Sequence, residues 1–361
     1  MSHGWTGGQY SLYRVVFGTY LFLHFSRLIP WGGELLSHEA VVTLLTIAAA
    51  SSVLFAAGWF DRTAALVLLL VGAFLAGRHP LLANPGLAYV GCLLLAHLFI
   101  RPAPYGAWSA RGRVDPRGGW SLHGRIYGAA WVVLAVGYAY SGYTKLLDPS
   151  LLDGSAVLRL ATWGSLAAEL AFAPLALFGR VRPFLWGALL SMQLSRMLLI
   201  EPAHLGLGLV MLHLFTFDPR WVRPSRAGTV DTLLYDGSCG LCHRAVRFVL
   251  AEDRAAAFRF APLGGETFRN NVPASSRLAL PDSLVIATAD GRLVTRASGV
   301  RYLMQRLGGV WRCLALASRL VPTALLDRGY DLVAAIRHRL FRRPQAACPI
   351  LPDELRDRFG S

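Results

Sequence analysis

Cys239 and Cys242 have the spacing of a redox-active dithiol, and Asp236 stands three residues before the first of them. The apolar run 232–235 predicts a strand, and the amphipathic pattern over 242–250 predicts a helix. At the start of a helix, unpaired backbone N–H groups and the positive end of the helix dipole stabilise an anion. The thiolate is the reactive form of cysteine, so this position favours a nucleophilic Cys239. The pattern therefore predicts a redox centre.

Two other interpretations fit the same cysteines. The pair is also half of a potential zinc site, with His243, Cys313 and Cys348 as further candidate ligands, but structural zinc usually takes two closely spaced ligand pairs. Inert buried thiols are the other alternative, which suits an isolated cysteine better than a pair at a strand-to-helix turn. A strand, a turn and then Cys-x-x-Cys is the arrangement of a thioredoxin-like domain. We therefore favour redox chemistry and expect no metal.

The rest of the chain is unusually apolar. Hydrophobic residues make up 54% of the 361 residues and charged residues 16%, which is too apolar for a soluble enzyme of this length. About eight membrane-spanning helices are predicted, some shorter than the ~20 residues that a perpendicular span needs. They cover residues 12–29, 40–60, 64–77, 85–100, 126–143, 163–178, 183–200 and 205–217. No small-residue cleavage site follows the first of them, so no cleavable signal peptide is expected.

These segments predict the domain organisation. We expect a polytopic α-helical membrane domain over residues 1–222, a linker over 223–229, and an α/β thioredoxin-like domain over 230–361. The linker is rich in proline, glycine and arginine and has little apolar content.

The positions of the arginines predict the orientation of the membrane domain. With eight spans, the arginine-rich connections all fall on one side, which the positive-inside rule assigns to the cytoplasm. They contain Arg101, Arg111, Arg113, Arg117, Arg125, Arg180, Arg182, Arg220, Arg223 and Arg226. We therefore expect a multi-pass protein of the inner (cell) membrane with the dithiol domain in the cytoplasm, where a disulfide is normally transient. The net charge of +15 then indicates contact with anionic membrane lipids, and no nucleic acid partner is expected.

Lys145 is the single lysine among the 36 basic residues. An ammonium group can release its proton, whereas a guanidinium group keeps its proton at any accessible pH. Lys145 lies at the outer end of the fifth predicted span, so it is a candidate catalytic base. The alternative is an anchoring lysine whose charged end reaches the membrane surface.

Other polar residues are predicted at the same depth as Lys145. Ionisable groups inside spans are costly and usually face one another or a cavity. Their common depth predicts a polar pocket that opens to the extracytoplasmic side or to the lipid. The candidate binding residues are His24, Arg27, Tyr143, Glu169 and Arg196.

The segment from about Val230 to the C-terminus resembles the DCC family of thiol–disulfide oxidoreductases, named for an Asp-x-x-Cys-x-x-Cys motif. The similarity extends over residues 258–263 and 282–291 and over the closing segments 321–330, 337–339 and 348–359. It implies that Cys239 is the attacking thiolate and Cys242 the resolving thiol. Asp236 would be a proton acceptor or, alternatively, only a turn former. Cys348 matches a family cysteine of unassigned role, and Pro281 stands where thioredoxins carry a cis-proline.

The N-terminal region resembles the HTTM superfamily, which includes the vitamin K-dependent γ-glutamyl carboxylases. The resemblance is carried by Tyr140–Leu146 with Gly154, and by Glu169 in its apolar segment. It implies that Lys145 corresponds to the lysine base of the carboxylases. The chain departs from them at Asn84-Pro85, where they have Asn-His, and it has no large extracytoplasmic β domain. Glutamate carboxylation is therefore disfavoured. Binding of a quinone-like lipid in the predicted pocket remains the candidate role for a cofactor.

These features together predict a membrane-embedded thiol–disulfide oxidoreductase. Its substrate would be a thiol or disulfide, either a protein or a small molecule, and a quinone-like lipid would be its electron partner in the membrane. The alternative is an integral membrane enzyme related to the carboxylases, with Lys145 as base and the dithiol domain as reductant or regulator. A transporter or scaffold with a redox sensor is a third interpretation.

Overall fold

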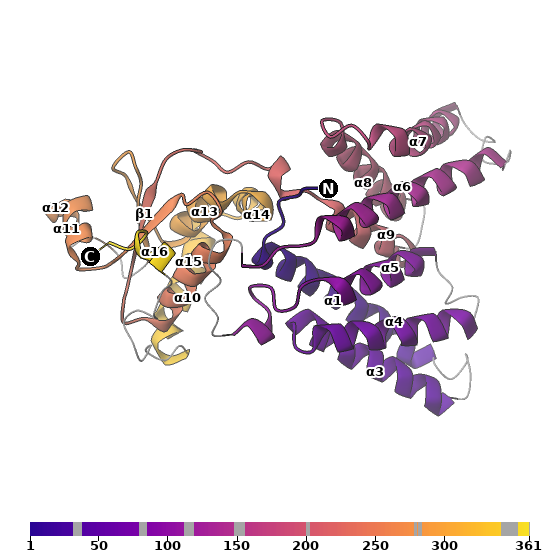
Figure 1. Cartoon of the computed structure of the whole chain (residues 1–361), viewed down its shortest axis with the longest axis horizontal. Helices are drawn as coiled ribbons and strands as arrows, with labels where there is room; N and C mark the ends of the chain where they lie inside the picture. The colour runs from indigo at the N-terminus through magenta and orange to yellow at the C-terminus, as the bar shows by residue number, and fades with distance from the viewer. Residues whose placement is uncertain are drawn as a thin grey trace. The chain divides into compact units, whose positions relative to one another are not determined.

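The structure, a computed structural model, describes residues 1–31, 38–78, 85–111, 119–147, 156–199, 203–277, 280, 284–340 and 353–360 (Figure 1). It divides into two compact units. The helical unit contains Met1–His3, Ser11–Ser109 and Leu122–Asp218, and the mixed unit contains Gly4–Tyr10, Ala110–Ser121 and Pro219–Ser361. The domain limits expected at 222 and 229 remain predictions.

Eight α-helices lie in the described part of the chain before residue 217, and each overlaps one predicted apolar segment. They are α1 (Gly7–Leu28), α3 (His38–Ala57), α4 (Asp61–Arg78), α5 (Pro85–Phe99), α6 (Gly124–Leu147), α7 (Ala156–Leu175), α8 (Arg182–Leu199) and α9 (Ala203–Thr216). Short 3-10 turns cover Ile29–Trp31 and Trp108–Ala110. The prediction of helices at these positions is confirmed.

The prediction of about eight membrane spans is not supported. Within the described ranges, one helix, Glu39–Ala57, is long and apolar enough to cross a membrane by length and composition. A second would pass only if Gly309–Leu320 and Thr323–Arg337, bent by 115°, formed one span. Gly86–Phe99 and Gly206–Thr216 are apolar but short. The other predicted spans are helices whose length or composition does not meet the requirement.

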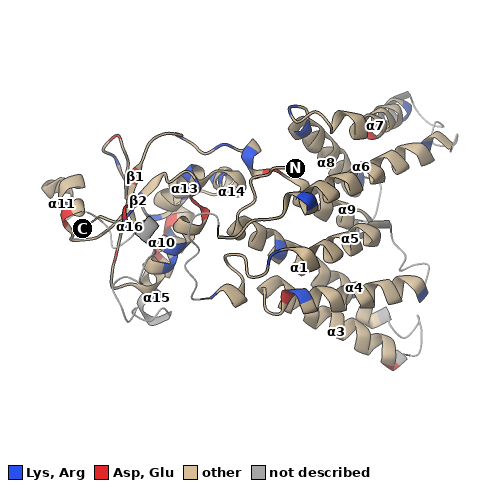
Figure 2. Cartoon of the chain, in the orientation of Figure 1, with Lys and Arg blue, Asp and Glu red and all other residues tan. Residues whose placement is uncertain are grey.

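The helical unit buries several polar side chains within an apolar core and also exposes many large apolar side chains. Arg14, Glu169 and His213 are fully buried. Large apolar side chains are exposed instead, including Phe184 at 78% and Leu198 at 84%. Charged residues are sparse along these helices in Figure 2. Large exposed apolar patches of this kind mark interaction surfaces.

The mixed unit is built on a four-stranded sheet of order β2-β1-β3-β4. The strands are β1 (Asp231–Tyr235), β2 (Phe258–Pro262), β3 (Val285–Ala287) and β4 (Leu293–Thr295). β1 runs parallel to β2, and the connection between them contains helix α10 (Gly240–Glu252). β3 pairs antiparallel with both β1 and β4. A turn at Asp290-Gly291 joins β3 to β4, and Gly291 has a φ of 78° that favours glycine.

The remaining described helices of the mixed unit pack on the sheet or on one another. They are α11 (Glu266–Asn271), α12 (Ala274–Arg277), α13 (Arg296–Leu307), α14 (Gly309–Ala317), α15 (Thr323–Leu340) and α16 (Asp353–Arg356), with 3-10 turns at Pro219–Trp221 and Ser318–Leu320. Side chains alternate across β1, so that Leu233 and Tyr235 join one core cluster while Leu234 joins another. The cluster with Leu233 contains both cysteines of the motif.

The C-terminal segment is joined to the edge strand β2. The N–H of Phe260 donates to the carbonyl of Arg358 at 2.8 Å, and the N–H of Gly360 donates back to the carbonyl of Phe260 at 2.8 Å. The guanidinium of Arg358 is paired with Asp253, which also accepts the N–H groups of Ala257 and Phe258. These contacts satisfy backbone groups that an edge strand would otherwise leave unpaired.

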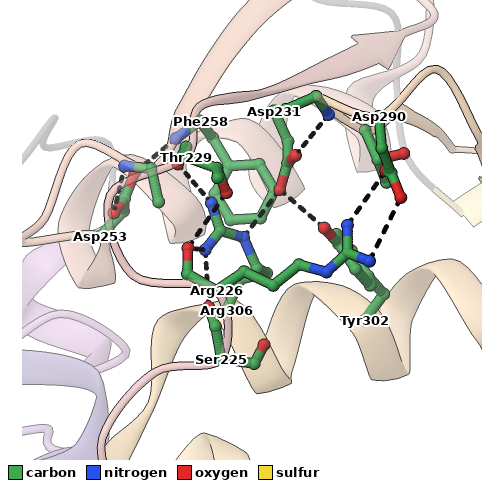
Figure 3. A network of polar contacts seen from close by, with 12 residues as sticks. Ser225, Arg226, Thr229, Asp231, Asp253, Phe258, Asp290, Tyr302 and Arg306 are labelled. Atoms are coloured by element: carbon green, nitrogen blue, oxygen red, sulfur yellow. Dashed lines mark hydrogen bonds and ion pairs between the residues drawn. The ribbon is translucent and has the colours of Figure 1, made fainter.

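A buried ion pair fastens the predicted linker to the sheet. The Nε of Arg306, on α13, lies 2.7 Å from Oδ2 of Asp231 at the start of β1, and both side chains are buried (Figure 3). The same guanidinium donates to the backbone carbonyls of Ser225, Arg226 and Thr229. The linker expected over 223–229 is therefore held against the mixed unit by Arg306.

Candidate redox site

The dithiol lies at the junction of β1 and α10. The N–H of Cys239 donates to the carbonyl of Asp236 at 3.2 Å, which closes the turn after the strand. Cys239 then takes the N-cap position with φ −100° and ψ 117°, and its carbonyl accepts the N–H of His243 at 3.1 Å. Helix α10 therefore begins at Gly240, two residues earlier than predicted. Cys239 stands at the end where the helix dipole favours an anion.

Asp236 shapes the turn that presents Cys239. Its Oδ1 accepts the backbone N–H of Ser238 at 2.8 Å and the hydroxyl of Ser238 at 2.8 Å. This is the pattern by which an aspartate side chain stabilises a tight turn. The geometry agrees with the turn-forming alternative, and a role for Asp236 as proton acceptor remains a prediction.

His243 supports the same turn from the first turn of α10. Its Nε2 lies 2.9 Å from the carbonyl oxygen of Gly237, and its ring meets Tyr235 edge-on with 5.7 Å between ring centroids. Cys313 lies on α14, and Cys348 lies outside the described residues. Within the described part of the chain, no group of three or more His, Cys, Asp or Glu side chains could hold a metal ion.

Both cysteines are buried. Cys239 is 1% exposed and Cys242 is 6% exposed, and no disulfide joins them in this structure. Burial raises the pKa of Cys242 from 9.0 to about 12, and a hydrogen bond with the Cys239 thiol acts in the same direction. The guanidinium of Arg337 opposes part of this shift. The raised pKa keeps Cys242 protonated at neutral pH.

A cavity of about 450 Å³ reaches the dithiol at Cys242. Its walls are mostly apolar and come from α10, α13 and α15. Two arginines, Arg301 and Arg337, also line it. The described lining residues are Leu241, Cys242, Ala245, Leu284, Ala297, Val300, Arg301, Met304, Ser318, Leu326, Gly329, Tyr330, Val333, Ala334 and Arg337. Cys239 is not one of them.

Sequence reasoning did not identify this cavity. A signal was present on α15, where Leu326, Tyr330, Val333 and Arg337 follow one another at intervals of four, three and four residues. Residues at these intervals share one face of a helix. The sequence could not show that α10 and α13 supply the facing walls, because those segments are distant along the chain.

A second polar cluster lies in the helical unit. Nζ of Lys145, on α6, is 2.6 Å from Oε1 of Glu169 on α7 and 3.4 Å from the hydroxyl of Ser165. Nη1 of Arg196, on α8, is 4.0 Å from the same Oε1. Glu169 is fully buried, and its Oε2 has no hydrogen-bond partner among the described residues. The structure thus brings together three of the six polar residues predicted for the membrane pocket and adds Ser165.

The other three predicted pocket residues lie elsewhere. Tyr143 is 56% exposed, although it is two residues from Lys145. The ring of His24 packs against those of Tyr20 and Phe25, and Arg27 is exposed in the last turn of α1. Pro281, expected at a cis-proline position, lies outside the described residues. Their roles in binding remain predictions.

Comparisons with known proteins point to the same dithiol. The profile of the family described as DCC1-like thiol-disulfide oxidoreductase matches residues 233–343. The Bacillus subtilis (strain 168) protein "Uncharacterized protein YuxK" is 30% identical over 131 residues, which are 35% of this chain and 91% of that protein. The Arabidopsis thaliana "DCC family protein At1g52590, chloroplastic" is 29% identical over 111 residues, which are 31% of this chain and 64% of that protein.

No solved structure matches the chain. The resemblance of the N-terminal region to the HTTM superfamily remains a prediction, since the family profile begins at residue 233. The matched residues include both cysteines and the preceding Asp236. Through this region the chain belongs to the DCC1-like thiol-disulfide oxidoreductase family.

Proposed function

We propose that the chain is a membrane-embedded thiol–disulfide oxidoreductase with a thioredoxin-like domain whose redox pair is Cys239 and Cys242. The observation that carries the proposal is the pair of buried free cysteines at the N-terminus of α10, directly after β1. Cys239 takes the N-cap position of α10, where the positive end of the helix dipole favours a thiolate. The strand order β2-β1-β3-β4 with a parallel first pair supports a thioredoxin-like fold.

The reaction transfers two electrons. A substrate disulfide oxidises the dithiol through a mixed disulfide, two substrate thiols leave, and the Cys239–Cys242 bond forms. The reverse reaction reduces the protein disulfide and releases a substrate disulfide. Asp236 and His243 hold the turn that fixes the position of Cys239.

Embedding of the helical unit in a membrane is part of the proposal. It is supported by the exposed apolar side chains on α6, α7 and α8 and by the span-like helix Glu39–Ala57. The arginine distribution supports a cytoplasmic position for the mixed unit in a multi-pass protein of the cell membrane. A quinone-like lipid is the proposed electron partner, because a redox dithiol and a buried polar cluster in an apolar bundle occur in one chain.

Turnover of a small disulfide tests the redox assignment. The full chain in detergent would be assayed with glutathione disulfide as substrate and dithiothreitol as reductant. We expect Cys239→Ser and Cys242→Ser each to lower the catalysed rate to the background rate. Cys313→Ser is the matched control, because Cys313 is a free cysteine of the same unit on α14, and it should keep the wild-type rate. Wild-type turnover in either motif variant would refute the proposal.

The ion pair of Lys145 and Glu169 favours a second candidate function. A fully buried carboxylate with one oxygen lacking a described partner is a feature of functional sites within membranes. In that case the chain is an integral membrane enzyme of HTTM type with Lys145 as base, and the dithiol is its reductant or regulator. As a base, Lys145 would first have to lose its 2.6 Å contact with Glu169. The geometry therefore supports this candidate less well than the redox function.

A further inference from the structure

Cys242 is the cysteine of the pair that lines the 450 Å³ cavity. Small-molecule sites typically occupy about 300–1,000 Å³. Cys242 is almost completely buried and Cys239 even more so, so a disulfide or thiol on the surface of a folded protein would have to enter the cavity to react. The cavity therefore selects a small reactant over a folded protein.

The wall of the cavity indicates the chemistry of that reactant. Apolar side chains such as Leu241, Val300 and Met304 form most of it, while Arg301 and Arg337 supply positive charge. Neither aspartate nor glutamate occurs among the described lining residues. Nε of Arg301 donates to the hydroxyl of Ser318 at 3.1 Å, which orients its guanidinium. A guanidinium pairs well with a carboxylate, and the remaining wall favours an apolar body.

We infer that the cavity binds a small thiol with an apolar body and a carboxylate, and that this thiol reduces the Cys239–Cys242 disulfide by attacking Cys242. The inference rests on the proposed redox function of the pair. It differs from the order expected from the sequence, in which Cys239 is the sulfur that reacts with the substrate.

The chemistry proceeds in two balanced steps. The ligand thiolate forms a bond with Sγ of Cys242, the Cys239–Cys242 bond breaks, and Cys239 leaves as a thiolate at the start of α10. Exchange is faster when the leaving sulfur forms the more stable thiolate, and this position stabilises one. A second ligand thiolate then attacks the ligand sulfur of the mixed disulfide. The ligand disulfide departs, Cys242 takes up a proton, and the two electrons lost by two thiols are gained by the protein disulfide.

The test uses the full chain in detergent, oxidised beforehand, with three reductants. The first is para-(mercaptomethyl)benzoate, the second is its uncharged methyl ester, and dithiothreitol is the reference. The two aryl probes differ only in the carboxylate. We expect the acid to show a saturable rate of reduction and to react about tenfold faster than the ester at low concentration. Acid-quenched samples should contain the mixed disulfide on Cys242, and its appearance on Cys239 would overturn the inference.

Two pairs of variants locate the binding site. Arg301→Gln should reduce the rate with the acid to that with the ester, whereas Arg328→Gln, an exposed α15 arginine outside the lining, should not change the ratio. A Cβ at Gly329 would have no heavy atom within 4 Å, so Gly329→Phe can fill the cavity without a backbone clash. This variant should abolish saturation by the acid, and Gly329→Ala should retain it.

The outcomes separate this inference from the proposed function. If dithiothreitol reduces the protein but the acid and the ester react equally fast, the inference about the ligand is wrong and the redox function stands. If the oxidised protein contains no Cys239–Cys242 disulfide for dithiothreitol to reduce, the proposed function itself fails.

Discussion

The carboxylate of Glu252 accepts the backbone N–H of Gly8 at a distance of 2.7 Å within the mixed unit. Glu252 is the last residue of α10, and Gly8 lies in the first turn of α1. The same carboxylate accepts the hydroxyl of Thr6 and, at 2.6 Å, the indole N–H of Trp311. The carboxyl group at this place accepts N-terminal donors that α1 would otherwise leave without a partner. The helix that begins at the dithiol therefore ends beside Gly8 and Thr6, which belong to the same unit.

Replacement of Glu252 by glutamine should change how stability depends on pH. Burial raises the pKa of Glu252 above its ordinary value of 4.5, and its three donors offset part of that shift. Because the folded state binds this proton more tightly than the unfolded state, the contribution to stability is present below pH 4.5 and is lost as pH rises through the folded pKa. As pH rises from 4.5 through the folded pKa, the melting temperature of the wild type should fall more steeply than that of Glu252→Gln. Parallel pH profiles would contradict this account.

Alanine at Gly8 should destabilise the mixed unit. A Cβ there would lie 2.7 Å from Cδ and from Oε1 of Glu252, both of which are held by their hydrogen bonds. Overpacking of this kind costs about 1–3 kcal/mol. Gly329→Ala is the matched control, since its Cβ meets open space, and it should leave the melting temperature unchanged or higher. Equal effects of the two substitutions would show that the Glu252 contact does not confine Gly8.

Loss of the Arg306 guanidinium should strongly destabilise the mixed unit. Arg306→Leu would leave Asp231 buried without its charged partner, and removing one member of a buried ion pair typically costs about 3–5 kcal/mol. It would also release the carbonyls of residues 225, 226 and 229 (Figure 3). Chemical denaturation of the full chain measures the effect.

Arg226→Gln provides the comparison for Arg306→Leu. Arg226 pairs with Asp290 on the surface at 3.0 Å, and water screens such exposed pairs. Its removal should change the denaturation midpoint little. If Arg226→Gln lowered stability as much as Arg306→Leu, the surface pair of Arg226 and Asp290, and not the buried pair with Asp231, would hold the linker.

Lys145→Arg should separate the anchoring role of Lys145 from its proposed pocket role. Arginine keeps the positive charge, so the contact with Glu169 and insertion of the chain into the membrane should persist. It cannot act as a proton acceptor, and its planar head differs in shape from an ammonium group. We expect normal expression and loss of the proposed quinone-like lipid, measured by mass spectrometry of the lipids extracted from the purified wild type and variant. Unchanged lipid in the variant would return Lys145 to an anchoring role.

The sequence predicted the local structure of the redox site because its signals are short-range. Strand 232–235 and a helix after the cysteines follow from apolar periodicity, and the structure differs only in adding Asp231 and starting α10 at Gly240. Asp231 was missed because a buried carboxylate at the start of a strand depends on Arg306, which lies 75 residues away. The burial of Cys239 likewise depends on packing that periodicity does not reveal.

The sequence predicted less well which polar residues of the expected membrane pocket lie together. Depth along a helix was inferred from the spans, but rotation about the helix axis was not. Tyr143 and Lys145 share one depth, yet residues two apart point about 200° from each other around a helix. Lys145 therefore meets Glu169 while Tyr143 is exposed. The apolar segments predicted helices correctly, but apolar periodicity alone does not establish that a helix crosses a membrane.

A redox titration of the full chain tests most directly whether Cys239 and Cys242 form a reversible redox pair. The protein would be equilibrated in dithiothreitol buffers of graded potential, alkylated, digested and mapped by mass spectrometry. The free thiols of Cys239 and Cys242 should disappear and reappear together in one two-electron transition, with a single disulfide-linked species as the oxidised form. Cys92 and Cys313 should remain alkylated as free thiols throughout. If Cys239 and Cys242 stay alkylated separately at every potential, or pair with other cysteines, the dithiol is not the redox centre.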